Sequence, residues 1–421
     1  MPLNAILRSP EHNIIAQCTE APYTPFCQNS EFYDEKQFAK RNHQVNGDGF
    51  GVGFYTEHRH TRKRTSCTFR SVRPAWSDNN LAEISRFATC DLCFVHVRAA
   101  SPGMPVSESA CHPFCFGGRW LFMHNGGISH FKKVKRALIA RIRDDIYPFL
   151  KSMTDSEVAF GLFLSQFPEE LLHESAGLAS AELSSARLEV GLRNTVVMIT
   201  EEQKRAGLSE EQSASSLNFA VTDGTTVVAM RCRTHRRQDP PTLYYCEEMP
   251  VAVKTPTKSY RRLVQSSAGE YRCFITSEPL DYDDKKWKLI PKDSVIVATR
   301  SSVCIKPMRL PQWDRLGKVN LWQALTPVFP AVEETSTDAP PIFSLAGSDE
   351  EDEKEEITFR NDRRQKGAAV RGQREYYAHG QRRHATRASR EFVLVAAASM
   401  AIGAMISVMI SQRNLRESKL K

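Results

Sequence analysis

The chain has 421 residues, of which 41% are hydrophobic and 25% are charged, values that are ordinary for a globular protein. Its net charge of +8 is uneven, with an acidic block over 348–356 and an Arg-rich stretch over 360–390, so the overall charge favours no class of partner. The segment from Met1 to Gln17 lacks a continuous apolar core, which argues against a secretory signal and predicts that the eleven cysteines are reduced thiols.

Short segments with the length and apolar content of strands alternate with segments of helical spacing along the first two thirds of the chain. The expected strands are Phe50–Tyr55, Cys67–Val72, Leu92–Ala99, Trp120–Met123, Asn218–Val221, Thr226–Arg231, Tyr244–Cys246, Cys273–Thr276 and Val295–Ala298. The expected helices are Leu81–Ala88, Val134–Ile142, Glu157–Leu164 and Ala181–Val190. This mixture predicts an α+β fold.

Two of these strands end at polar residues suited to an amino-acid-like substrate. The Asn125 amide and the Gly126 N–H can together hold a developing oxyanion. Arg98 offers a planar fork for a carboxylate, and His96 lies on the same strand face. The alternatives are a structural ion pair for Arg98 and a type I′ hairpin turn at Asn125-Gly126, which is compatible with the oxyanion role. The pattern predicts a site for acyl transfer.

Two cysteine pairs have spacings that occur in zinc sites. The pairs are Cys90 with Cys93 and Cys111 with Cys115, and both lie close to the strand that leads to Arg98. Buried structural thiols are therefore preferred over a zinc ribbon. We expect no metal ion and no cofactor.

The composition changes towards the C-terminus. The segment 333–390 is acidic and then basic, and it has few large apolar residues. We expect it to be a disordered tether, because it cannot bury enough apolar surface to offset the loss of conformational entropy on ordering. The segment 392–412 carries no charge and is close to the length that crosses a hydrocarbon core. A single transmembrane helix is favoured over a core helix or a surface helix, with a short basic tail, 413–421, after it. The flanking charges place the N-terminal side at the cytoplasmic face of the membrane.

Five motifs in chain order resemble those of class-II glutamine amidotransferases, which are N-terminal-nucleophile hydrolases. The motifs are Asn46-Gly47-Asp48-Gly49-Phe50-Gly51-Val52-Gly53, His96-Val97-Arg98-Ala99, Cys111-His112-Pro113-Phe114, Met123-His124-Asn125-Gly126 and Thr154-Asp155-Ser156-Glu157. The nearest resemblance is to the branch with the fungal amidotransferase-like subunit that degrades glutathione. It implies a four-layer αββα sandwich over residues 1–325, a substrate such as glutamine or another γ-glutamyl amide, and a peptidase-type partner subunit.

The resemblance also implies roles for the candidate site residues. In the family, a cysteine thiolate attacks the γ-glutamyl carbonyl, and water or an acceptor resolves the thioester. Asn125 and Gly126 match the oxyanion hole. Arg98, with His96 beside it, matches the clamp for the substrate α-carboxylate. Asp155 matches the acceptor of the substrate α-amine, although a helix-capping motif at this point explains Asp155 nearly as well.

A turn and a pocket wall complete the implied site. Asn46, Gly47 and Asp48 match a turn that faces the nucleophile in relatives, where glycine allows close backbone approach. His112 matches the pocket wall. Cys111 is not expected to replace the nucleophile, because in the family the base is the α-amine of the nucleophile itself.

One departure from the family matters as much as the match. The family's nucleophile is a cysteine that follows the initiator Met at the head of a short strand, whereas this chain begins Met1-Pro2 and its first cysteine is Cys18. We therefore expect this strand to be absent. Either the sequence lacks its true start and the protein is a hydrolase, or it is a non-catalytic amidotransferase fold that binds γ-glutamyl ligands or partners. A third hypothesis, RNA or anionic-lipid binding through the Arg-rich stretch, ranks last, and nucleic acid is not an expected partner.

Overall fold

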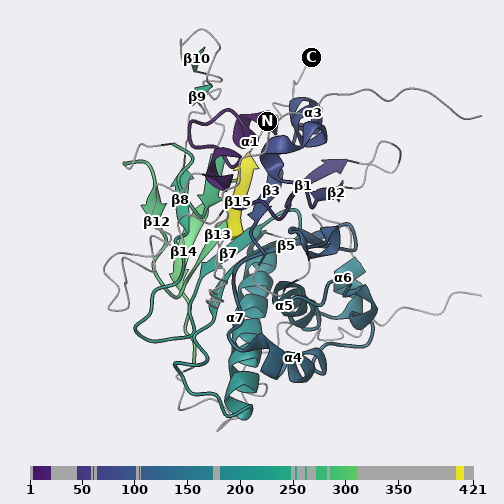
Figure 1. Ribbon diagram of the computed structural model, residues 1–421, viewed down its shortest axis with the longest axis vertical. Helices are drawn as coiled ribbons and strands as arrows, with labels where there is room; N and C mark the ends of the chain where they lie inside the picture. The colour runs from purple at the N-terminus through teal and green to yellow at the C-terminus, as the bar shows by residue number, and fades with distance from the viewer. Residues whose placement is uncertain are drawn as a thin grey trace, which may run out of the picture. The chain divides into compact units, whose positions relative to one another are not determined.

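Two antiparallel sheets form the centre of the computed structural model of the chain (Figure 1). The seven-stranded sheet has the order β12-β8-β11-β15-β3-β1-β2, and the six-stranded sheet has the order β14-β13-β7-β6-β5-β4. The first sheet contains β1 (Phe50–Glu57), β2 (Arg64–Ser71), β3 (Leu92–Arg98), β8 (Tyr244–Glu247), β11 (Arg272–Thr276), β12 (Lys288–Leu289) and β15 (Ala404–Ser411). The second contains β4 (Phe114–Phe116), β5 (Trp120–Gly127), β6 (Ser216–Thr222), β7 (Val227–Arg231), β13 (Ser294–Ala298) and β14 (Val303–Pro307). A separate hairpin pairs β9 (Ala252–Val253) with β10 (Arg261–Arg262).

Helices lie against both sheets. They are α1 (Asn4–Leu7), α3 (Asn79–Phe87), α4 (Phe131–Ile139), α5 (Asp155–Leu164), α6 (Glu169–His173) and α7 (Ala181–Arg205). Short 3-10 turns are η1 (Ala16–Cys18), η2 (Ala75–Ser77), η3 (Glu108–Ala110) and η4 (Tyr147–Phe149). In Figure 1, α4, α5, α6 and α7 lie together, while α1 and α3 lie near the upper end of β3.

The structure describes residues 3–19, 45–57, 60, 64–100, 104, 106–173, 181–247, 252–253, 261–262, 272–281, 285–311 and 404–411. All of them belong to one unit, formed by Met1–Pro330 and Ala398–Lys421, while the second unit, Ala331–Ala397, lies outside the described residues. The expected tether over 333–390 and the basic tail over 413–421 therefore also lie outside them.

Three apolar clusters show that the unit has four layers. One cluster lies between α4, α5, α7 and the six-stranded sheet, with Phe122 and Phe160 among its members. A second lies between the two sheets and includes Phe94 and Met123. A third covers the outer face of the seven-stranded sheet and joins α1 to β3 through residues such as Val95. Three interfaces require four layers, so the expected αββα sandwich is confirmed for the described residues.

Several elements extend beyond their expected bounds. The strand expected over Trp120–Met123 continues to Gly127, because β6 pairs with it along its whole length except the first residue. The helix expected over Ala181–Val190 continues to Arg205. Gly191 does not end this helix, since its lack of a side chain lets α7 approach the Phe163 ring of α5, which a Cβ would meet at 2.8 Å.

The C-terminal segment differs from its prediction. Ala404–Ser411 forms β15, a central strand of the seven-stranded sheet, so these residues are not part of a membrane helix. No helix within the described part of the chain is long and apolar enough to span a bilayer. The physical reason for the mistaken prediction is that a strand covered on both faces is as free of charge as a membrane helix. The rest of the expected span, 392–403 and residue 412, lies outside the described residues.

Candidate active site

The candidate site lies at one end of the layer between the two sheets. Residues alternate between the faces of a strand, and Phe94 of β3 lies in the inter-sheet cluster, so His96 and Arg98 share its face. By the same alternation, Met123 of β5 puts Asn125 on the inter-sheet face of the other sheet. Ser277, which directly follows β11, connects the two sheets by accepting a hydrogen bond from Asn125 Nδ2 at 3.0 Å. The expected pairing of His96 with Arg98 on one face is confirmed.

Arg98 is held at the end of β3 by the turn over 46–49. The Asp48 N–H donates to the Arg98 carbonyl and the Arg98 N–H donates to the Gly49 carbonyl, both at 2.9 Å. The Arg98 guanidinium donates through Nη1 to the Asp48 carbonyl at 3.4 Å, and the Asp48 carboxylate accepts from the Ala100 N–H at 2.8 Å. Arg98 is only 6% exposed. A buried guanidinium whose shaft is fixed in this way is a preorganised binder of a carboxylate.

The same turn requires glycine where other elements press against it. A Cβ on Gly49, which has a φ of +116°, would lie 2.6 Å from the Ser71 carbonyl and 2.7 Å from the Cys111 sulfur. A Cβ on Gly47 would lie 3.1 Å from the Trp76 ring. Asp48 of this turn contacts Arg98, while the expectation that the turn faces a nucleophile stays a prediction. The Asn46 side chain is itself buried and donates through Nδ2 to the Gln17 carbonyl at 3.4 Å.

His96 and His112 form a neutral pair beside Arg98. Their rings contact edge to face, and His96 Nε2 lies 2.8 Å from His112 Nδ1, so one of the two nitrogens donates to the other. Burial, then the positive charge of Arg98, lowers the pKa of His96 to about 3. Burial followed by His96 lowers the pKa of His112 well below its usual value. Neither ring competes with Arg98 as a cation, and the place of His112 in a pocket wall stays a prediction.

Asn125 and Gly126 lie inside β5 rather than in a hairpin turn. They pair with Asn218 and Leu217 of β6, so the type I′ turn that was considered for them is wrong. The Asn-Gly pair indicated a turn because the strand that pairs with it, β6, is distant in sequence and could not be recognised as a partner. Gly126 has a φ of +139°, and a Cβ there would lie 2.1 Å from the Ser216 carbonyl oxygen. The backbone at this point thus requires glycine, and it positions the Asn125 amide at the site.

The structure bears out the helix-capping interpretation of Asp155, while its role as acceptor of the substrate α-amine stays a prediction. Asp155 is the first residue of α5, whose N-cap, Thr154, accepts from the Glu157 N–H, so the capping motif is real. One Asp155 oxygen also accepts from the Ile128 N–H at 3.0 Å, which ties the carboxylate to the chain just after Gly127. Asp155 is therefore brought next to the Asn125-Gly126 end of β5, within the candidate site.

His124 precedes Asn125 in the motif Met123-His124-Asn125-Gly126, but its side chain faces the helical layer. Its Nε2 donates to the Ser216 carbonyl at 2.9 Å, which leaves Nδ1 to accept from the Ser156 hydroxyl at 2.9 Å. Burial lowers its pKa, while the nearby Asp155 charge and the Ser216 carbonyl act in the opposite direction. His124 thus links β5, β6 and α5 behind the site.

The loop after β11 is a part of the site that sequence reasoning missed. Ser277 contacts Asn125, and the adjacent Pro279 carbonyl lies 2.7 Å from His12 Nδ1 and accepts from Gln17 Nε2 at 3.2 Å. His12 also lies 3.7 Å from a Glu278 carboxylate oxygen. The signal for this loop was present, because an apolar strand that stops at Ser-Glu-Pro has the same pattern as the one that revealed Asn125.

Four cysteines lie in the motifs near the site, and none of them forms a disulfide. Cys111 donates to the Ser71 and Ser107 carbonyls at 3.5 Å, and burial raises its pKa although the Arg98 charge lowers it. Cys90 and Cys93 are buried and form no disulfide, and a hydrogen bond with Cys90 followed by burial raises the pKa of Cys93 well above its usual value. Cys115 is half-buried. Within the described residues, no three His, Cys, Asp or Glu side chains are arranged to hold a metal ion.

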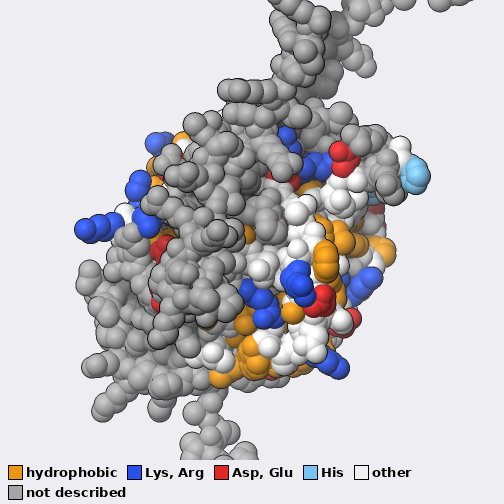
Figure 2. All heavy atoms as spheres, turned by 90° about the horizontal axis from the view of Figure 1, so that it is seen from above, with side chains coloured by type: hydrophobic (Ala, Val, Ile, Leu, Met, Phe, Trp, Pro, Cys, Tyr) orange, Lys and Arg blue, Asp and Glu red, His pale blue; other side chains and the backbone are white. Residues whose placement is uncertain are grey.

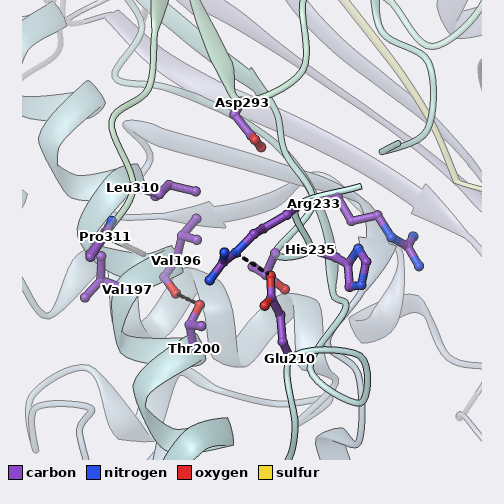
Figure 3. A pocket seen from close by; sticks show the side chains of 11 residues that line it. Val196, Val197, Thr200, Glu210, Arg233, His235, Asp293, Leu310 and Pro311 are labelled. Carbon is purple, nitrogen blue, oxygen red and sulfur yellow. Dashed lines mark hydrogen bonds and ion pairs between the residues drawn. The ribbon is translucent and has the colours of Figure 1, made fainter. Parts of the chain in front are cut away.

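A cavity of about 220 Å³ lies apart from the residues expected at the site (Figure 3). It is bordered by Val196 and Thr200 of α7 and by the loop residues after β7. Glu210 crosses it and pairs with Arg236 at 3.2 Å. Asp293, whose pKa is raised by burial, lies at another edge. None of the residues expected at the site lines this cavity, so it is not taken as the candidate active site.

Comparison with known proteins agrees with the motifs. A family model for class-II glutamine amidotransferases matches residues 27–313. The "probable glutamine amidotransferase DUG3" of Saccharomyces cerevisiae is 31% identical over 317 residues, which are 73% of this chain and 80% of the yeast protein. A γ-glutamyl-hercynylcysteine sulfoxide hydrolase of Mycolicibacterium smegmatis is 35% identical over 82 residues, 20% of this chain and 34% of that protein.

Two solved structures are also similar. A glutamine aminotransferase class-II domain protein from Silicibacter pomeroyi matches with a TM-score of 0.42 and 24% identity, covering 62% of this chain and 92% of that one. A predicted glutamine amidotransferase from Pseudomonas aeruginosa matches with a TM-score of 0.36 and 20% identity, covering 62% of this chain and 87% of that one.

Proposed function

Because the chain belongs to the class-II glutamine amidotransferases, we propose that it binds glutamine or another γ-glutamyl amide at the Arg98 site and that this site serves hydrolysis of the γ-amide bond. The observation that carries the proposal is that Arg98 and Asn125, on facing strands of the two sheets, share one end of the inter-sheet layer, where Ser277 accepts from Asn125. A cation for a carboxylate and a donor for a carbonyl oxygen are the two groups that a γ-glutamyl ligand requires.

The ligand fits the charges of the site. The α-carboxylate would pair with the Arg98 guanidinium, and the α-ammonium would pair with the Asp155 carboxylate. The γ-carbonyl oxygen would accept from Asn125, whose amide nitrogen has two hydrogens, only one of which is directed to Ser277. His96 Nδ1 is buried and has no hydrogen-bond partner among the described residues, as expected for an atom that faces a ligand site.

The chemistry would proceed through a γ-glutamyl thioester. A thiolate attacks the γ-carbonyl, the oxyanion is held by Asn125 and Gly126, the amine leaves with a proton, and water then resolves the thioester. Cys111, the described cysteine that interacts electrostatically with Arg98, is a protonated hydrogen-bond donor and is unsuited to attack. We therefore expect this chain to bind its ligand without turnover unless a cysteine is supplied at the site.

The γ-glutamyl group is the substrate feature that the relatives have in common. One relative is named as a probable glutamine amidotransferase and the other as a hydrolase of a γ-glutamyl compound. Glutathione is the γ-glutamyl amide that we propose in the first place, with a peptidase-type subunit as the expected partner. An alternative function is that of a non-catalytic γ-glutamyl-binding or regulatory subunit, which the protonated state of Cys111 favours.

Two further expectations concern location and nucleic acid. Location at the cytoplasmic face of a membrane stays a prediction, although it cannot rest on Ala404–Ser411, which forms β15, and carbonate extraction of the full-length protein is its test. For nucleic acid, the described part of the face in Figure 2 shows Lys and Arg side chains scattered among acidic and hydrophobic ones. A continuous basic strip, which is the usual footprint of a nucleic-acid site, is not seen on the described part of this face.

Ligand binding by the full chain tests the proposal. Isothermal titration with glutamine and with glutathione should give saturable binding. Arg98→Lys should weaken it roughly tenfold or more, because a charge-assisted hydrogen bond is worth about 1.5–3 kcal/mol. Arg236→Lys, a matched change in the separate cavity, should leave binding unchanged. Equal effects of the two substitutions, or no binding by the unaltered chain, would contradict the proposal.

A further inference from the structure

The strand β15 lies between two strands that are far from it in sequence. Seven residue pairs join it to β3, from Ala404 opposite Arg98 to Ile410 opposite Leu92. Five pairs join its other edge to β11, from Ser407 opposite Thr276 to Ser411 opposite Arg272. In Figure 1 it is the yellow strand in the middle of the seven-stranded sheet.

The space between β3 and β11, here called the strand slot, requires an occupant. Neighbouring strands lie about 4.8 Å apart, so β3 and β11 are about 9.6 Å apart and too distant to pair with each other. Every residue of β3 is buried, and apolar clusters cover both faces of the sheet. Unpaired N–H and C=O groups in such a place are costly. An uncharged strand is required, and 404–411 carries no charge.

One end of the slot lies at the candidate site. Ala404 is opposite Arg98 on one side, and Ser407 is opposite Thr276 on the other. Because the pairing is antiparallel, the next residue after Thr276, which is Ser277, flanks the N-terminal half of β15. The first residue of β15 therefore lies beside Arg98, and Ser277, which accepts from Asn125, is level with a residue two positions further along the strand.

We propose that the slot is a strand-binding site which this chain fills with its own segment Ala404–Ser411, and that this segment closes the candidate site against catalysis. The closure rests on the proposed function; the strand placement does not. Ala404 is joined to Gly403 in the chain, so β15 brings no free amine to the end of the slot beside Arg98. Tethering in the same chain favours this occupant over a free peptide, because it raises the effective concentration.

Native cysteines allow the placement to be tested by cross-linking. Met409 is opposite Cys93, and Ile410 is opposite Cys273. Directly opposed residues in antiparallel strands have Cβ atoms about 4.5–5.5 Å apart, close to what a disulfide needs. Met409→Cys should therefore form an intramolecular disulfide with Cys93 under prolonged mild oxidation, identified by peptide mass spectrometry. Ile410→Cys, with Cys273, repeats the test on the other edge if the first variant does not fold.

Val408→Cys is the matched control, since Phe94 and Ile275 are opposite Val408 and provide no thiol. It should remain reduced under the same conditions. Failure of both Met409→Cys and Ile410→Cys to cross-link would overturn the placement. Disulfides between two chains would overturn the proposal that the occupant is the chain's own segment, and so would recovery of the segment in lipid vesicles as a protease-protected helix.

The position of the slot end is tested separately. In Ala404→Cys, saturating glutamine should slow alkylation of the new thiol at least severalfold, because ligand at Arg98 covers it. Alkylation of Ser411→Cys, at the far end of the strand, should not change. If the disulfides form and glutamine binds but does not protect Ala404→Cys, the closure is refuted while the strand placement stands. If glutamine does not bind at all, the proposed function fails instead.

Discussion

Replacing Gly126 with Ala should be among the most destabilising single changes near the site. Two costs add at this position. The φ of +139° is strained for any residue with a Cβ, which costs about 1–3 kcal/mol. The Cβ would also lie 2.1 Å from the Ser216 carbonyl oxygen, and separating β5 from β6 costs about another 1–3 kcal/mol. We expect Gly126→Ala to lower the free energy of unfolding by about 4 kcal/mol in total.

Urea unfolding of the full chain measures this loss, and Gly207 supplies the matched control. Gly207 also has a positive φ, +71°, but no atom lies within 4 Å of the position of its Cβ. Gly207→Ala should therefore cost only the backbone term, about 1–2 kcal/mol. The difference between the two variants isolates the contact with Ser216. If they lose equal stability, the close packing of β5 on β6 at the site is wrong.

Three other predictions follow from the site. Burial lowers the pKa of His96 and of His112 in the folded chain, whereas the unfolded chain takes up protons on both rings below about pH 6.5. The free energy of unfolding should therefore fall as the pH drops from about 6.5, by about 1.4 kcal/mol per pH unit for each ring. A flatter dependence of the free energy of unfolding on pH in His96→Gln checks this prediction. The Glu157 carboxylate accepts from three backbone N–H groups of the preceding loop. Glu157→Gln should therefore lower the free energy of unfolding by about 2 kcal/mol, measured with urea. Glu83→Gln, on the exposed face of α3, is the control and should lower it by less than about 0.5 kcal/mol. With a Cys-headed strand added before Met1 and Ala404–Ser411 deleted so that the strand slot is free, steady-state kinetics should show that Asn125→Ala lowers kcat by roughly 10²–10³-fold and that Arg98→Lys mainly raises KM; unchanged specific activity in both would refute the assigned roles.

Much of the site could be predicted because its signals are local. Strand alternation alone put His96 and Arg98 on one face, and a polar end to an apolar strand revealed Asn125. The capping motif at Asp155 is a local signal as well, and the structure shows it beside the Asp155 contact with Ile128. Such features depend on residues a few positions apart, so one sequence is enough to recognise them.

The features that sequence reasoning missed depend on pairing between distant segments. Gly127 ends β5 because β6, about ninety residues later, extends alongside it. Ser277 reaches Asn125 across 152 positions of sequence. For 404–411, absence of charge is compatible with a membrane helix and with a central strand, and only the open place between β3 and β11 distinguishes the two. The hydrophobic periodicity of a segment carries no information about such an open position in a sheet, because the position is created by the arrangement of other strands.

The central claim is that Arg98, Asn125 and Gly126 form a γ-glutamyl site that becomes catalytic when a cysteine takes the place of β15. Intact-mass spectrometry after brief incubation with glutamine tests it most directly, on the unaltered chain and on a form with a Cys-headed strand before Met1 and with Ala404–Ser411 deleted. We predict a γ-glutamyl adduct on the added cysteine, lost on its replacement by Ser and strongly reduced by Asn125→Ala, and no adduct on the unaltered chain. The claim would be contradicted by an adduct on the unaltered chain, or by a folded Cys-headed form that binds glutamine but never acquires one.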